Sequence, residues 1–132
     1  MNNIAYLLLR LGIGISMFGH GLVRLTKLQK FSEWLVGNFK KSFLPDFMVV
    51  PFSYALPFAE FLVGLFVVLG LFTQQSLTAG GIVMLVLIFG STTIENWDAL
   101  PSQLIHLAFF AVLLHFVQSN SVALDQLKKQ QL

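Results

Sequence analysis

The chain has 132 residues, of which 56% are hydrophobic and 11% are charged, and it carries a net charge of +2 and no cysteine. Soluble domains contain roughly 25% charged residues, so these charges are too few to cover a surface that faces water. The missing cysteines exclude disulfides, thiolate chemistry and cysteine-ligated metal centres. The small net charge, with most basic residues in one loop, also argues against a nucleic-acid partner. We therefore expect a single integral membrane domain, residues 1–132.

The charges are distributed as in a protein that crosses a bilayer several times. Residues 61–94 and residues 99–124 contain no Asp, Glu, Lys or Arg. One transmembrane helix needs about 20 apolar residues. The first stretch therefore fits most of two helices with a tight turn, and the second fits one. Together with an apolar N-terminal segment, they predict an all-α, polytopic bundle of four transmembrane helices.

The first predicted helix runs from Ile4 to Leu25. Met1-Asn2-Asn3 supplies no basic region and Arg10 interrupts the apolar run, so we expect a retained helix rather than a cleaved signal peptide. Glycines lie on two opposite faces of this helix, which predicts close packing on both sides and a central position. The two pairs are Gly14 with Gly21, and Gly12 with Gly19.

The segment from Thr26 to Val49 is the one long connection, and it contains its own helical pattern. Apolar side chains recur at helical spacing on one arc, while lysines lie on the other side. We predict a short amphipathic helix over Leu28–Lys40 that lies in the membrane interface, with its aromatic residues toward the bilayer. The alternative is a helix that caps the bundle. The apolar arc consists of Leu28, Phe31, Trp34, Leu35 and Phe39.

Three further spans follow this segment. They are predicted at Val50–Phe72, Ser76–Ile94 and Pro101–Val117, and the polar connections Thr73–Gln75 and Glu95–Asp98 separate them. The tail after residue 118 is polar, without a span.

Four spans place both termini on one face of the membrane, which we call side A, and the amphipathic segment on the other face, side B. Side B carries five basic residues, Arg24, Lys27, Lys30, Lys40 and Lys41, whereas side A carries only Lys128 and Lys129. The positive-inside rule therefore favours side B in the cytoplasm of a multi-pass protein of an inner membrane.

Glu60 is the most unusual residue within the spans. At about 1.5 Å per residue, it lies about 15 Å from the side B end of its helix, near the bilayer midplane. It shares a helical face with Ser53, Pro57, Gly64 and Val67. Intramembrane carboxylates mark proton or ligand sites, and the alternative is a structural carboxyl paired with Arg10.

Two histidines lie at matching depth below side B. His20 and His106 belong to antiparallel spans, so contact or a shared ligand is sterically feasible. Their ring nitrogens are suited to a quinone carbonyl, a haem iron or a metal, and the alternative is hydrogen bonding to backbone or water. His115 lies near side A and is unrelated to this pair. Small and polar neighbours, including Gln103, predict a pocket bounded by spans 4–25, 50–72 and 101–117 and entered from side B.

Two sequence blocks resemble the DoxX family. In the first, Arg10 precedes His20-Gly21, and Arg24 follows four positions after the His, as in the first helix of that family. In the second, Glu60-x-x-x-Gly64 leads into a Gly-Leu-Phe-Thr sequence ending at Thr73, which is similar to the second helix of the family.

This resemblance implies a four-helix membrane protein that is often linked to redox systems. One branch of the family includes a subunit of thiosulfate:quinone oxidoreductase, and others associate with superoxide-defence or sulfurtransferase partners. A distant relationship reaches the Surfeit-locus cargo receptors, which are not enzymes. His106 has no counterpart in the family pattern.

Three functions follow as hypotheses. The first is a membrane subunit of a redox complex that binds a quinone through Arg10, His20, Arg24 and Glu60, with a redox partner protein or a second copy beside it. The second is a non-enzymatic scaffold or receptor in which these residues tie helices together. The third is a b-type haem protein that uses His20 and His106. No Gly-rich nucleotide motif is present, so a partner or a diffusible carrier supplies any electrons.

Overall fold

The computed structural model describes residues 1–131, and within this range the chain is helical with no β-strand. The elements are α1 (Asn3–Thr26), α2 (Leu28–Phe39), α3 (Asp46–Leu69), α4 (Thr73–Thr93), η1 (Trp97–Ala99), α5 (Leu100–His115), η2 (Val117–Ser119) and α6 (Leu124–Gln130). Four stretches are long and apolar enough to cross a membrane: α1, α3, α4, and η1 joined to α5. The predicted all-α bundle of four transmembrane helices is confirmed.

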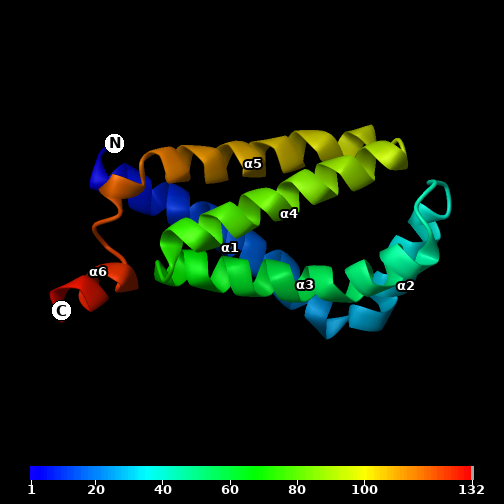
Figure 1. Cartoon of the computed structure of the whole chain (residues 1–132), viewed down its shortest axis with the longest axis horizontal. Coiled ribbons are helices and arrows are strands. Elements are labelled where there is room, and N and C mark those ends of the chain that lie inside the picture. Colours follow the sequence, from blue (N-terminus) through cyan, green and yellow to red (C-terminus); the bar gives the residue numbers. More distant parts are fainter. Residues whose placement is uncertain (132) are drawn as a thin grey trace.

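The elements divide between the two ends of the bundle as the connection lengths predict. The N-terminus, the α3–α4 turn and α6 lie at side A, and α2 and the α4–α5 connection lie at side B (Figure 1). Within the bundle, α1 packs most extensively against α3, and α4 against α5. Tyr6, Met17, Val67, Leu77 and Phe110 are among the buried side chains of the core between them.

The second and third spans begin earlier than the sequence predicted. α3 begins at Asp46 instead of residue 50, because Pro45 is extended and the helix continues through Pro51. It ends at Leu69, where Gly70 adopts a left-handed backbone conformation with φ 66°. Thr73–Gln75 was expected as a turn but forms the first turn of α4.

Glycines set the distance between α1 and α3. A Cβ atom on Gly21 would overlap the backbone of Phe61, and one on Gly64 would overlap the backbone of Phe18. The two helices therefore approach as closely as their backbones allow. Gly12 and Gly19 have open space around them, so the predicted packing on both faces of α1 is wrong.

The amphipathic segment folds as a helix at the predicted place. α2 packs against α3 and buries Leu35 and Ser32. The Ser32 hydroxyl donates to Ser53 Oγ at 2.6 Å, since the hydroxyl proton of Ser53 is already used in a hydrogen bond to a carbonyl of its own helix. Trp34 remains 59% exposed. One face of α2 thus caps the bundle while Trp34 stays largely exposed. Its position in the membrane interface stays a prediction.

Candidate functional site

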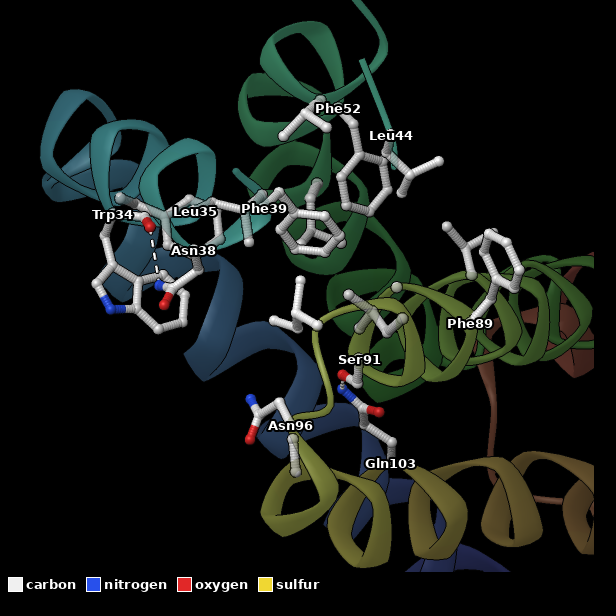
Figure 2. A pocket seen from close by; sticks show the side chains of 18 of the residues that line it. Trp34, Leu35, Asn38, Phe39, Leu44, Phe52, Phe89, Ser91, Asn96 and Gln103 are labelled. Atoms are coloured by element: carbon white, nitrogen blue, oxygen red, sulfur yellow. Dashed lines mark hydrogen bonds between the residues drawn. The ribbon is translucent and has the colours of Figure 1, made fainter. Parts of the chain in front are cut away.

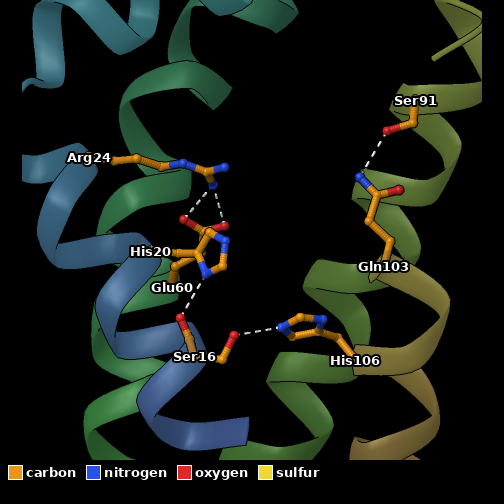
Figure 3. A network of polar contacts seen from close by, with 7 residues as sticks. All are labelled: Ser16, His20, Arg24, Glu60, Ser91, Gln103 and His106. Carbon is orange, nitrogen blue, oxygen red and sulfur yellow. Dashed lines mark hydrogen bonds and ion pairs between the residues drawn. The ribbon is translucent and has the colours of Figure 1, made fainter. Parts of the chain in front are cut away.

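Glu60 and Arg24 form an ion pair that joins α3 to α1. The Glu60 side chain is 3% exposed, whereas the Arg24 side chain is 28% exposed. Nη1 of Arg24 donates to both carboxylate oxygens, at 2.6 and 2.7 Å (Figure 3). The prediction that Glu60 is buried beside a polar group of the first helix is confirmed.

The α3 face that carries Glu60 is the one the periodicity predicted. Ser53, Pro57, Gly64 and Val67 are all buried on that face. Because Gly64 meets the backbone of α1 directly, the next helical turn places the carboxylate beside Arg24. The ion pair is therefore a consequence of the close crossing of α1 and α3.

Arg24 is held on a second side by an aromatic ring. Its guanidinium carbon lies 4.7 Å from the centre of the Phe31 ring of α2, which is cation–π geometry. Among residues 1–131, no hydrogen bond engages Nε or Nη2 of Arg24. The guanidinium therefore keeps donors for a further partner.

His20 and His106 come together as predicted, with ring centres 6.2 Å apart and nearly perpendicular planes. In each ring Nδ1 lies 2.7 Å from the carbonyl four residues earlier, on Ser16 and Ser102 respectively. A carbonyl only accepts, so both Nδ1 atoms carry a proton. The Ser16 hydroxyl lies 2.8 Å from Nε2 of His106, and it donates to that atom in the neutral ring. Ser16 and His106 thus form a hydrogen-bonded link between α1 and α5, and the His20 ring packs beside it (Figure 3).

A cavity of about 310 Å³ opens at side B, within the range of small-molecule sites. Its wall is largely apolar and aromatic, with Phe39, Phe52 and Phe89 around it (Figure 2). Its polar lining consists of Arg24, Asn38, Ser91, Asn96 and Gln103. The predicted pocket is correct in its place below α2, but its boundaries were wrong: α2, α3 and α4 form most of the wall, while α1 and α5 each contribute one residue.

Gln103 was named in the sequence only as a polar neighbour of the predicted pocket and was not selected as a site residue. Its Nε2 donates to the Ser91 hydroxyl at 2.9 Å, while its Oε1 is buried with no hydrogen-bond partner among residues 1–131. The signal in the sequence was weak, because a single Gln near the end of a span is usually interfacial.

Arg10 lies apart from the other predicted site residues, and its predicted pairing with Glu60 is wrong. It is 3% exposed and donates through Nη1 to the side-chain oxygen of Asn120, which follows the last span. The Asn120 amide in turn donates to the Thr73 hydroxyl at 3.0 Å. Arg10 therefore ties α1 to the tail and to the start of α4 at side A, far along the bundle from Arg24.

The tail caps α4. The Asp125 carboxylate accepts from the backbone N–H groups of Phe72 at 2.7 Å and Thr73 at 2.8 Å, where α4 begins. Lys128 lies over the Phe72 ring, 4.3 Å from its centre. Burial raises the pKa of Asp125, but the hydrogen bonds from Thr73 and Phe72 and the charge of Lys128 outweigh it, so the pKa lies below its ordinary value. A polar tail was expected, but this docked helix cap was not.

His115 lies exposed at side A against the ring of Phe116, apart from the other two histidines. Within residues 1–131, no group of three or more His, Asp or Glu side chains is placed to hold a metal ion. Four of the five predicted site residues, Arg24, Glu60, His20 and His106, thus gather in the half of the bundle nearer side B (Figure 3).

The comparisons with known proteins give one match. The DoxX family model matches residues 5–93, about two thirds of the chain, from the first turn of α1 to the end of α4. No curated protein and no solved structure matches the chain.

Proposed function

The chain belongs to the DoxX family, and we propose that it is the membrane subunit of a redox complex that binds a quinone at side B. The observation that carries this proposal is the position of Arg24, which bonds the buried Glu60 on one side and lines the apolar cavity on the other. A quinone carbonyl accepts hydrogen bonds, and Arg24 has donors available for it. The apolar wall suits the rest of such a ligand.

Reduction of a quinone also requires two protons, one for each oxygen. The buried Glu60 carboxyl and the His20 ring, which carries a proton on Nδ1, lie in this half of the bundle and are able to exchange protons. The electrons come from a partner protein or a diffusible carrier. We expect such a complex in an inner membrane, with side B toward the cytoplasm.

The haem hypothesis has less support. Nε2 of His106 is engaged by Ser16, and the cavity is lined by neither histidine. Ligation of a haem by both rings would require Ser16 to release His106 and the two helices to admit a porphyrin between them. A Soret band in purified protein would nevertheless favour it.

A scaffold or receptor is the second candidate function. It is favoured by the fact that Arg10, Arg24 and Glu60 all have partners within the chain. In that case the ion pair only fixes helix positions, and the cavity contains lipid.

The test uses purified protein in mild detergent with its two tryptophans as reporters. Trp34 lines the cavity and Trp97 does not, so Trp97→Phe leaves one reporter at the site. Added short-chain benzoquinone should quench Trp34 saturably, and endogenous quinone should appear in the organic extract. Arg24→Gln should abolish both signals, while His115→Gln, at the exposed opposite end, should not. A protein that extracts without quinone and shows only linear quenching would favour the scaffold.

A further inference from the structure

The side B cavity is lined by a single charged side chain. Within residues 1–131, only Arg24 brings a charge to its wall, and the rest of the lining is apolar or neutral. The lysines and the other acidic residues at this end of the bundle are exposed and do not line the cavity. Arg24, together with whatever neutralises it, therefore decides which charge a ligand headgroup meets inside the cavity.

Glu60 neutralises Arg24 from outside the cavity. Its carboxylate accepts two hydrogen bonds from Nη1 of Arg24, at 2.6 and 2.7 Å, and its side chain is 3% exposed. Glu60 is not one of the residues that line the cavity. The pair as a whole thus carries no net charge, although the arginine is the member that the cavity reaches.

Arg24 keeps hydrogen-bonding capacity after this neutralisation. Its Nε and Nη2 have no hydrogen-bond partner within residues 1–131, and neither atom is fully buried. The Phe31 ring covers a face of the guanidinium, 4.7 Å from its central carbon, which leaves the edge of the group for a ligand. Figure 3 shows the Glu60 carboxylate on one side of this edge only. The site therefore offers donors without a net positive charge.

We propose that Glu60 makes this cavity selective for a neutral hydrogen-bond acceptor on an apolar body, and that it excludes anionic amphiphiles. This inference rests on the proposed function, because it specifies the headgroup charge that the quinone site takes. A carbonyl oxygen accepts a hydrogen bond from Arg24 without adding a charge. A carboxylate or phosphate would instead place a second anion on a guanidinium that is already paired.

The size of this discrimination follows from the distance between the two acceptors. A ligand oxygen bonded to Nε or Nη2 would lie about 5–6 Å from the Glu60 carboxylate, since each hydrogen bond to the guanidinium is about 2.8 Å long. At an effective dielectric constant of about 20, two negative charges at this separation repel strongly enough to weaken binding at least about tenfold. A neutral carbonyl oxygen experiences no such repulsion.

The experiment uses two probes that share one tail and differ in headgroup charge. They are ω-bromoundecanoate, at about pH 9 where its carboxyl group is ionised, and its methyl ester. Bromine quenches nearby indoles, so in detergent-solubilised Trp97→Phe protein each probe reports its occupancy of the cavity through Trp34. Trp34→Phe protein keeps Trp97, which lies outside the cavity and reports the amount of probe in the micelle. The ratio of the two signals removes the difference in micelle partition.

Three variants are compared in these two backgrounds. Glu60→Gln, which keeps an oxygen for Arg24, should raise the affinity for the anion relative to the ester at least about tenfold. Adding Arg24→Gln to Glu60→Gln should remove that gain, because no cation then lines the cavity. Glu33→Gln removes an exposed carboxylate of α2 that does not line the cavity, and it should leave the ratio of affinities unchanged.

The outcomes separate this inference from the proposed function. Equal affinity of the parent protein for the anion and the ester overturns the inference, and this measurement needs no change at Glu60. A Glu60→Gln protein that is folded by far-UV circular dichroism but shows no gain for the anion also overturns it. Decyl-benzoquinone is tested in the same way. If the ester binds while the quinone and the anion do not, the charge selection is supported and the quinone-binding function is overturned.

Discussion

The Arg24–Glu60 pair gives a quantitative test of how this bundle is held together. The two charges are not equally exposed, since the Glu60 side chain is 3% accessible and that of Arg24 is 28% accessible. Arg24→Leu would leave the carboxylate buried with no cation, which for a buried pair costs about 3–5 kcal/mol. Glu60→Leu would leave Arg24 partly exposed and still over Phe31, which costs less, about 1–3 kcal/mol. We expect Glu60→Gln, which keeps an oxygen for Arg24, to preserve the fold.

The double variant decides whether the pair itself is the cause. If each single change is harmful because it strands the other charge, Arg24→Leu combined with Glu60→Leu should be more stable than Arg24→Leu alone. The coupling energy should be at least about 1 kcal/mol. The assay is denaturant unfolding in one fixed detergent, followed by far-UV circular dichroism. Glu33→Leu, which removes an exposed carboxylate on α2, should change stability by less than about 0.5 kcal/mol.

The result that would refute this reasoning is additivity. If the two single losses sum to the loss of the double variant, the charges contribute independently and the hydrogen bonds between them do not stabilise the bundle. The close packing of α1 on α3 would then hold these helices without help from the pair.

Further changes test the packing, the tail and the histidine link. Gly21→Ala should destabilise the protein by about 1–3 kcal/mol in the same unfolding assay, because the added methyl group forces α1 away from α3. Gly19→Ala, in open space on the same helix, should instead stabilise the protein by about 0.5–1 kcal/mol. Equal effects of the two substitutions would contradict the assigned crossing of α1 and α3. The lowered pKa of Asp125 means that its stabilisation of the docked tail is fully present above the ordinary pKa of 3.8 and is lost as pH falls through the lower folded-state pKa. Asp125→Asn should therefore speed proteolysis of the tail several-fold at neutral pH, and the difference from wild type should shrink as the pH falls below 3.8. A pH-independent difference would count against this cap. Ser16→Ala should expose Nε2 of His106 and raise its modification by diethyl pyrocarbonate, measured by mass spectrometry, and unchanged labelling would show that the serine does not protect it.

The sequence predicted correctly which helix faces point into the bundle, but it predicted less well which side chains meet there. α1 shows why. Helical periodicity places Arg10 and Arg24 on the same face, and both proved to point into the bundle. The two residues are separated by about 21 Å along the helix, so only the register between α1 and α3 decides which one meets Glu60. That register comes from the contacts of Gly21 with Phe61 and of Gly64 with Phe18, and no local pattern in either helix specifies it.

The tail was unpredictable for a related reason. Asn120 and Asp125 lie in a short polar segment without strong periodicity, and nothing nearby in the chain indicates a partner. Their partners are Arg10, Phe72 and Thr73, all distant in sequence. Such contacts arise only after the four spans have brought side A together. The cavity at side B escaped full prediction in the same way, because its walls come from five different helices, α1 to α5.

The parts of the candidate site differ in how far the family accounts for them. Arg24 and Glu60 lie within residues 5–93, the range matched by the family model, whereas Gln103 lies beyond it. The ion pair also follows from the crossing of α1 and α3, so any chain that keeps this crossing and these two residues keeps an arginine at the cavity. Gln103 contributes nothing to that crossing, and its amide bonds Ser91 between α5 and α4 instead. The arginine at the cavity and the polar contact between α4 and α5 are therefore separable properties of this fold.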